Sequence, residues 1–431
     1  MNHENRNHED ENRETEGKEV NADSGVRSSA SGGEKTDDRF RAGILAGLAA
    51  ALVILICIWG VWTIADRVHG SFATGEITEK DVADKLDQLN ALIDKYYLYE
   101  DEIDEDALID GIYSGYAAAL GDPYTVYYGE EETKALFEST SGEFSGIGAT
   151  MSQAAGGGTI TVTDVYEDSP ADKAGMKAGD ILCQVDDKPV DGESLETVVS
   201  WVKGEKGTEV TLYVERDGEQ LELTAVRDTI EMQTVEYEMK EDQIGYIAVS
   251  EFDEVTYDQF KEALDDLENQ GMEGLVIDLR NNPGGNLDTV TDMLRLLLPE
   301  GTIVSIKDKD GNSEELTCDG ENEFTKPLAV LVNQYSASAS EIFSAAIQDY
   351  GTGRIVGVTT YGKGVVQQLI TLGDGTCLKL TIAEYFTPSG RSINGTGVEP
   401  DVEVQYVYDA DNPEGDNQLD AAISTVREEM E

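Results

Sequence analysis

The pattern of hydrophobic and polar positions changes abruptly near the start of the 431-residue chain. Residues 1–41 are polar and contain almost no large apolar side chains. Such a segment cannot bury enough surface to offset the entropy of ordering, which predicts a disordered tail. Residues 42–65 contain no charged side chain, and a helix of that length would cover the ~30 Å hydrocarbon core of a bilayer. The pattern therefore predicts one membrane-spanning helix.

Basic residues set the expected orientation of this span. Lys35, Arg39 and Arg41 precede it, whereas Arg67 alone follows it closely. This asymmetry favours a single-pass protein of the cell membrane, with a cytoplasmic tail and an extracytoplasmic C-terminal portion. The alternative is a cleaved signal peptide with Ser71-Phe72-Ala73 as its cleavage site, although the leader and its apolar run are long for that role.

Two further regions precede the largest part of the chain. Apolar residues recur at helical spacing within residues 76–140 and predict two helices, the second of which ends at Gly121 and Pro123. Residues 142–228 then consist of short β-type runs separated by Gly, Pro and Asp turns. This second region is predicted to be a compact β-rich domain with a core of its own.

The pattern changes again in residues 229–410, where apolar strands alternate with helices. Runs such as GLVIDLR and PLAVLVN are typical of buried strands in a sheet covered by helices, which predicts an α/β core. Chemistry in such folds gathers at the C-terminal ends of strands, where NNPGG (281–285) and SASAS (336–340) fall. Residues 411–431 are predicted to form a C-terminal helical segment.

Charge narrows the class of partners. The chain has 88 Asp and Glu residues against 31 Lys and Arg residues, a formal net charge of -57. Binding of phosphates relies on clustered Lys and Arg, so nucleic acid is not an expected partner. The acidity is interpreted as an aid to solubility.

The positions of the histidines limit which catalytic mechanisms the chain can use. The three histidines are His3, His8 and His69, so no imidazole is available in the folded regions that follow. Ser-His-Asp triads, Cys-His pairs and HExxH zinc sites are thereby excluded there. A serine activated by a neutral lysine needs no imidazole, and neither a metal nor a cofactor is expected.

Ser338 has two interpretations. In the first, Ser338-Ala339-Ser340-Glu341 is a capping box at the start of a helix. In the second, the same location between a strand and a helix gives Ser338 backbone N–H groups that would hold an oxyanion, as a nucleophile needs.

Lys363 and the turn at Asn282-Pro283-Gly284-Gly285 also have two interpretations each. A lysine is commonly a solvated surface charge, but Lys363 lies between two glycines beside apolar runs, where burial would lower its pKa toward that of a base. Gln367, four residues later, would lie on the same side and orient the amine. The glycine pair forms either a plain turn or an oxyanion hole, made by Gly284 or Gly285 together with Ala339.

Several motifs in one order resemble the C-terminal processing peptidases, which are exported serine proteases with an inserted PDZ domain. The resemblance runs from about Leu89 to the end of the chain. It is carried by GDPYTVYY, FSGIGATM, DSPADKAGMKAGDILCQVD, GLVIDLRNNPGG, VNQYSASASEIFSAAIQD, GKGVVQ and YFTPSGRSINGTGVEPD.

This resemblance implies a crotonase- or ClpP-like α/β protease core with a mixed sheet. It implies Ser338 as nucleophile, Lys363 as base and Gln367 as supporting residue, with an oxyanion hole from the PGG turn and the residue after the serine. It also implies that residues 142–228 are the PDZ domain, and dimerisation through the N-terminal helices and the C-terminal helix follows from it as a hypothesis.

PDZ domains capture a terminal carboxylate with backbone N–H groups. That loop is expected at Ser145-Gly146-Ile147-Gly148. Lys203 stands where the family's RGxxGT pattern has arginine, so a planar guanidinium that would relay peptide binding is replaced by an ammonium.

The resulting hypothesis is a membrane-anchored serine endopeptidase that binds the free C-termini of exported proteins and cleaves those proteins. One alternative is a non-catalytic PDZ adaptor at the membrane. Another is a crotonase-like acyl-transfer or hydratase enzyme, which would give the PDZ domain no task.

Overall fold

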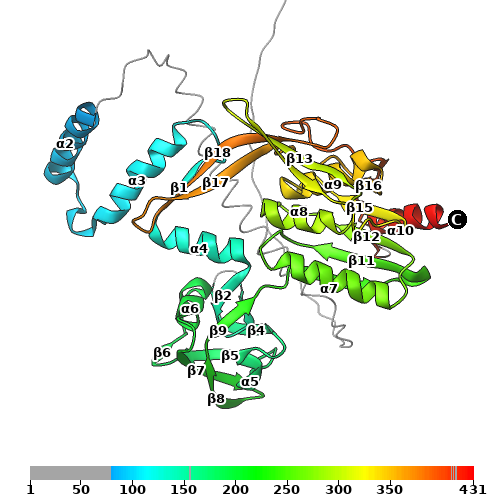
Figure 1. Ribbon diagram of the computed structural model, residues 1–431. Helices are drawn as coiled ribbons and strands as arrows, with labels where there is room; N and C mark the ends of the chain where they lie inside the picture. The colour runs from blue at the N-terminus through cyan, green and yellow to red at the C-terminus, as the bar shows by residue number, and fades with distance from the viewer. Residues whose placement is uncertain (1–78, 155–156, 409, 411, 413–414) are drawn as a thin grey trace, which may run out of the picture. The chain divides into compact units, whose positions relative to one another are not determined.

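The computed structural model describes residues 79–154, 157–408, 410, 412 and 415–431 (Figure 1). The tail and span predicted at 1–41 and 42–65 lie outside the described residues. Within the described part of the chain, no helix is both long enough and apolar enough to cross a membrane.

Helices dominate the first described region. It contains α2 (Glu79–Tyr96), α3 (Glu105–Ala118), the short strand β1 (Val126–Tyr128) and α4 (Glu130–Ser141). The first two helices were predicted from their apolar spacing. Helix α4 was not, because it opens with three glutamates and has few apolar residues to set a period.

The β-rich domain is built on a six-stranded sheet of order β3-β4-β5-β7-β8, with β6 paired to β5. Alternate residues of β7 are fully buried, as expected for a strand with one face on a core. A separate antiparallel pair, β2 and β9, carries the chain into and out of this domain. The elements are β2 (Glu143–Gly146), β3 (Ala149–Gln153), β4 (Ile160–Val165), α5 (Pro170–Lys173), β5 (Ile181–Val185), β6 (Lys188–Pro189), α6 (Leu195–Val202), β7 (Glu209–Arg216), β8 (Glu219–Val226) and β9 (Asp228–Glu231).

The α/β core is organised around a mixed sheet of order β10-β11-β12-β15-β16-β19, in which only the β10–β11 pair is antiparallel. Every residue of β12 and β15 is buried, which explains why all of them except Asp278 are apolar. The mixed α/β core is thus confirmed. Its elements are β10 (Val235–Met239), β11 (Ile244–Val249), α7 (Thr256–Asn269), β12 (Gly274–Asp278), α8 (Leu287–Arg295), β15 (Leu328–Val332), α9 (Ala339–Tyr350), β16 (Arg354–Gly357), β19 (Val402–Glu403) and α10 (Asn417–Met430).

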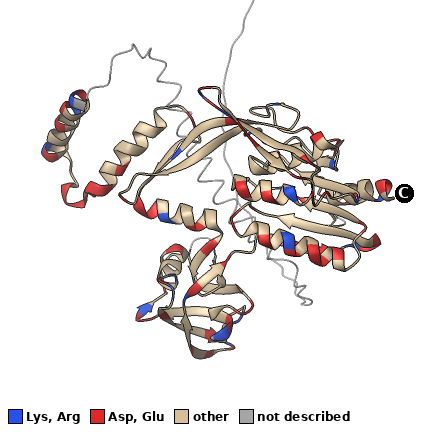
Figure 2. Cartoon of the chain, viewed as in Figure 1, with Lys and Arg blue, Asp and Glu red and all other residues tan. Residues whose placement is uncertain are grey.

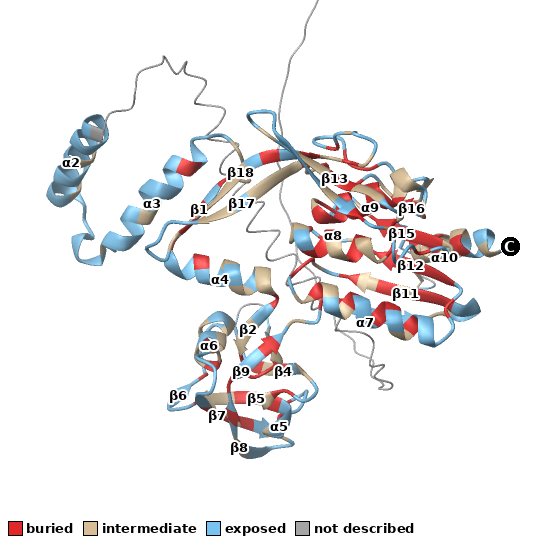
Figure 3. Cartoon of the chain, in the orientation of Figure 1, coloured by how far each residue is buried: buried red, intermediate tan, exposed pale blue. Residues whose placement is uncertain are grey.

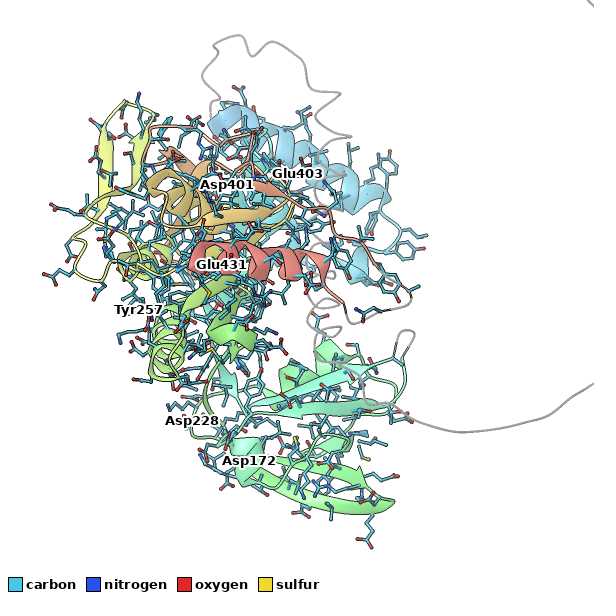
Figure 4. The ribbon with its side chains drawn as sticks, turned by 90° about the vertical axis from the view of Figure 1, so that its right-hand side faces the viewer. Asp172, Asp228, Tyr257, Asp401, Glu403 and Glu431 are labelled. Carbon is cyan, nitrogen blue, oxygen red and sulfur yellow. The ribbon has the colours of Figure 1, made fainter. Side chains whose placement is uncertain are left out.

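Helices cover both faces of this sheet. Apolar residues of α7, α8 and α9 share one buried cluster with one set of strand residues, and Ala422 and Val426 of α10 share another with the alternate set. Figure 4 views the end of α10 at Glu431, together with Asp401, whose carboxylate accepts the Ile355 N–H at 2.8 Å. In the cartoon of Figure 2, segments coloured for Asp and Glu are more frequent than segments coloured for Lys and Arg.

A second sheet of order β1-β18-β13-β14, with β17 paired to β18, lies beside the segment that carries Lys363. All its pairings are antiparallel. Its remaining strands are β13 (Gly301–Asp308), β14 (Ser313–Cys318), β17 (Val365–Thr371) and β18 (Cys377–Phe386). Strand β1 therefore joins the N-terminal region to the strands that follow Lys363.

Candidate active site

Ser338 lies between the end of β15 and the start of α9, and its backbone conformation is unusual. Its φ is 54° and its ψ is -113°, a region that non-glycine residues rarely occupy. The residue is half-buried, whereas Ala337 and Ala339 on either side are buried. Strained conformations of this kind persist where the surroundings hold them, and they cluster at functional sites.

Ser338 occupies the N-cap position, but its side chain makes no capping hydrogen bond. The Ser338 N–H donates to Glu341 Oε2 at 2.9 Å, and the Glu341 N–H donates to the Ser338 carbonyl oxygen at 2.8 Å. The Glu341 side chain and the backbone of Ser338 therefore form the cap. The hydroxyl is left for other chemistry.

Glu341 joins the serine segment to the lysine segment. Its Oε2 accepts the N–H groups of Ser338 at 2.9 Å and Lys363 at 2.8 Å. Its Oε1 accepts the Gly362 N–H at 2.7 Å and the Thr360 hydroxyl at 2.6 Å. The side chain is fully buried, and burial raises the pKa of Glu341 although these hydrogen bonds act to lower it. One carboxylate thus fixes two segments that are 25 residues apart in sequence.

Lys363 has the electrostatic setting of a base. Burial and the nearby charge of Lys379 lower its pKa to about 8, while Glu341 and Asp122 act in the opposite direction. Its Nζ lies 4.9 Å from the centre of the Tyr124 ring. Roughly a tenth of the amine is therefore neutral at pH 7, and about half is neutral at pH 8.

Tyr385 contacts the same two segments from β18. Its buried hydroxyl lies 3.2 Å from the Ser338 carbonyl oxygen and also contacts the Lys363 carbonyl oxygen. Glu341 binds the N–H groups of these residues and Tyr385 contacts their carbonyl groups. The backbones of Ser338 and Lys363 are consequently held together from both sides.

Gln367 does not contact Lys363 through a hydrogen bond in the described part of the structure. Its Nε2 donates to Thr381 Oγ1 at 3.2 Å instead. Lys363 precedes β17, and a bulge falls between Val366 and Gln367, so the two residues do not share one regular alternation of side chains.

The turn at 282–285 approaches the serine closely. A Cβ on Gly284 would lie 2.7 Å from Ser338 Cβ, and one on Gly285 would lie 2.4 Å from the Phe252 carbonyl oxygen. With φ values of 108° and 143°, these two positions need glycine for both space and conformation. The buried Asn282 holds the turn, because its Nδ2 donates to the Val249 carbonyl at 2.9 Å.

The donors at this turn are not equivalent. The Gly284 N–H donates to Asn282 Oδ1 at 2.8 Å, so it is occupied. Among the described residues, the N–H groups of Gly285 and Ala339 have no acceptor. Ala339 directly follows Ser338, and Gly285 directly follows Gly284, the residue that approaches Ser338. Free N–H groups next to a nucleophile are the donors that an oxyanion formed during acyl transfer would need.

Two of the four residues predicted to bind a substrate carboxylate, Ser145-Gly146-Ile147-Gly148, lie in a β-strand. Ser145 and Gly146 belong to β2 and pair with β9. The N–H groups of Ile147 and Gly148 have no acceptor within the described ranges, which leaves them for a ligand. Lys203 instead binds Glu138 of α4 at 2.9 Å, and its Nζ lies 5.1 Å from the centre of the Phe144 ring.

Comparison with known proteins identifies the protein family. Peptidase family S41 matches residues 243–404, and the PDZ domain family matches residues 161–216. The carboxy-terminal processing protease CtpA of Bacillus subtilis is 37% identical over 324 residues, which cover 74% of this chain and 69% of that protein. The chain therefore belongs to peptidase family S41 and carries a PDZ domain.

Within that family, the chain is similar to the carboxy-terminal processing proteases. A probable CtpA-like serine protease of Staphylococcus epidermidis is 35% identical over 362 residues, covering 82% of this chain and 72% of that protein. Among solved structures, a photosystem II D1 C-terminal processing protease is 29% identical and covers 76% of this chain and 93% of its own, with a TM-score of 0.43.

Sequence reasoning did not assign a role in the site to several residues that the structure places there. Glu341 was recognised only as part of a capping box and of a motif, Tyr385 only as the first residue of the motif YFTPSGRSINGTGVEPD, and Thr381 carried no local signal. The tyrosine and aspartate of GDPYT were noted only as part of a motif. A strand position such as 385 becomes informative only once the pairing of β17, β18 and β1 is known.

Proposed function

We propose that this chain is a membrane-anchored serine endopeptidase that recognises the free C-termini of exported proteins. Its own Ser338 and Lys363 would form the catalytic site that cleaves those proteins. The observation that carries the proposal is the shared carboxylate of Glu341, which binds the N–H groups of both residues through one oxygen atom. The lowered pKa of Lys363 supports its role as base. Membership of peptidase family S41 supports the reaction class.

In the proposed mechanism, neutral Lys363 takes the proton of the Ser338 hydroxyl as Oγ attacks the scissile carbonyl carbon. The developing oxyanion accepts hydrogen bonds from the N–H groups of Gly285 and Ala339. The Lys363 ammonium then gives its proton to the leaving amine, and an ester on Ser338 remains. Water, activated by the same amine, hydrolyses this ester. Gln367 would support the amine through its side-chain oxygen.

The PDZ domain would bring substrates to this site. A terminal carboxylate would bind the N–H groups of Ile147 and Gly148, and the peptide would add as a strand, as in other PDZ domains. The salt bridge between Lys203 and Glu138 links the PDZ domain to α4. Through this salt bridge, peptide binding to the PDZ domain would alter the position of α4.

An unstructured peptide with an apolar C-terminus tests this function. The full chain is expected to cleave it, with a KM at least about tenfold higher for the same peptide carrying a C-terminal amide, because the carboxylate supplies binding energy. Products are identified by mass spectrometry, and Ser338→Ala serves as the inactive reference. Carboxylate-dependent binding without cleavage would instead support the PDZ adaptor.

Membrane anchoring is proposed from the uncharged segment at 42–65 alone. The catalytic portion would then be extracytoplasmic, as the flanking basic residues favour. Membrane fractionation of the full chain and of a chain lacking residues 1–70 tests the anchor. Equal release of both into the soluble fraction would contradict it.

A homodimer is proposed because α2 and α3 carry many apolar residues that are exposed. Figure 3 shows both helices almost entirely in the colour for exposed residues. Helices with so many exposed large apolar side chains commonly pack against a partner. These residues are Leu89, Leu92, Tyr96, Leu108, Ile109, Ile112, Tyr113 and Tyr116. Native mass spectrometry of the full chain should give twice the chain mass, and a monomer at every concentration would exclude it.

A further inference from the structure

The turn Gly121–Thr125, between α3 and β1, lies against the lysine of the proposed active site. The ring of Tyr124 lies under the Lys363 amine, with 4.9 Å between Nζ and the ring centre. Burial and the neighbouring Tyr361 raise the pKa of Tyr124 to about 12, so the ring is neutral and attracts a cation through its π face. The proposed mechanism makes no use of this contact.

The same turn is connected to Gln367 through Thr381. Gln367 and Thr381 are opposite each other in the β17–β18 pair, and Gln367 Nε2 donates to Thr381 Oγ1 at 3.2 Å. The Thr381 N–H donates to Thr125 Oγ1 at 3.2 Å, and the Thr125 hydroxyl donates to Asp122 Oδ2 at 2.6 Å. The Gln367 amide nitrogen therefore donates to Thr381, and the Gln367 side-chain oxygen accepts no hydrogen bond from the described residues.

Asp122 is bound by both threonines. Burial alone would raise its pKa, but the hydrogen bonds of Thr125 and Thr381 lower it, so the carboxylate is charged. It also accepts the Tyr124 N–H at 3.1 Å, which fixes the backbone at the tyrosine. One charged carboxylate thus sets the position of the aromatic ring and of the residues that bind Gln367.

We propose that the turn Gly121–Thr125 is a positioning element of the active site, in which Tyr124 holds the ammonium form of Lys363 and Asp122 orients Gln367 through Thr381. The proposal rests on the proposed function for the identity of the base, and it adds residues from a part of the chain outside the α/β core. The ammonium forms twice in the reaction, each time Lys363 accepts a proton. A ring and a carboxylate beside it stabilise that charged form.

The groups that face Lys363 fix the expected direction of a pH effect. Glu341 of α9 favours the ammonium form of Lys363, and Lys379 of β18 disfavours that form. Tyr385 of β18 contacts only the backbone. From the turn come Asp122 and Tyr124, both of which favour the ammonium. Removing either turn residue therefore lowers the pKa of the Lys363 amine.

The experiment compares Tyr124→Phe, Tyr124→Leu and Asp122→Asn in the full chain. The acid limb of kcat/KM against pH reports the base of the free enzyme. We expect it to stay in place for Tyr124→Phe, which keeps the ring, and to move about 0.5–1 pH unit lower for Tyr124→Leu, which keeps the bulk without the π face. For Asp122→Asn we expect a downward shift and a kcat about tenfold lower at unchanged KM, because Gln367 is no longer oriented.

A second readout does not need turnover. Competitive labelling of amines over a pH series, followed by mass spectrometry of the peptide that contains Lys363, measures its titration directly. The same downward shifts are expected for Tyr124→Leu and Asp122→Asn. Asp310→Asn is the control, because it makes the same chemical change at an exposed turn and should move neither readout.

The outcomes separate the two proposals. An inactive wild-type chain would overturn the endopeptidase, while the labelling shifts would still support the positioning of Lys363 by the turn. An active wild-type chain whose Tyr124→Leu and Asp122→Asn variants titrate at the wild-type pH in both readouts would overturn the positioning element alone. If circular dichroism shows that Tyr124→Leu is unfolded, the titration of Lys363 in Asp122→Asn alone tests the positioning element.

Discussion

Replacing Lys363 with methionine is expected to lower kcat/KM by about 10³-fold or more and, at the same time, to raise the temperature of unfolding. The loss follows from removal of the base that takes the Ser338 proton. The gain in stability follows from the burial of the amine. Because the pKa of Lys363 is lowered to about 8, folding disfavours the charged form that prevails at neutral pH. Methionine fills a similar volume without that charge.

Lys363→Arg is the matched comparison. Arginine keeps the charge and cannot release its proton, so it should be as inactive as methionine but less stable than wild type. Wild-type activity should rise as the pH rises through about 8, since the amine gains its neutral form there. Kinetics from pH 6 to 9.5 and thermal unfolding of all three proteins provide the measurements. A methionine variant that cleaves at the wild-type rate would remove Lys363 from the mechanism.

The sequence predicted those parts of the fold whose signals are local. Strands β12 and β15 were recognised because burial on both faces favours runs of apolar residues, here Leu275–Ile277 and Leu328–Val332. Helix α4 was missed because its sequence has no apolar period. The glycine pair at 284–285 was recognised as special, but sequence alone did not show that Asn282 occupies the Gly284 N–H and leaves that of Gly285.

The remaining features of the site depend on distant pairings. The pKa of Lys363 is set by burial, by Lys379 on β18 and by Asp122 far earlier in the chain, and no spacing rule brings these together. A bulge follows Val366, and Gln367 is paired with Thr381 across β17 and β18, neither of which the local sequence indicates. The role of Glu341 was hidden because a capping box is a complete local explanation for a glutamate three residues after a serine.

Replacing Glu341 with glutamine is expected to lower kcat/KM by about 10²-fold or more and to destabilise the fold by about 3 kcal/mol or more. Each oxygen of the carboxylate accepts two hydrogen bonds in a fully buried site. Glutamine is nearly the same size, but its NH₂ group would face two donors in place of one oxygen. If the NH₂ group replaces Oε2, the N–H groups of Ser338 and Lys363 lose their acceptor and are pushed apart. If it replaces Oε1, the Thr360 hydroxyl can turn to accept from it, but the Gly362 N–H loses its acceptor.

Two comparisons separate this explanation from a general loss of charge. Glu314→Gln makes the same chemical change at an exposed strand position and should alter the unfolding free energy by no more than about 0.5 kcal/mol. Thr360→Ser keeps the hydroxyl that donates to Glu341 and should remain active. Urea unfolding gives the stabilities, and kcat/KM is measured where circular dichroism shows each variant folded. Wild-type activity and stability in Glu341→Gln would mean that Ser338 and Lys363 are held by other contacts, of which the Tyr385 hydroxyl is the one already present.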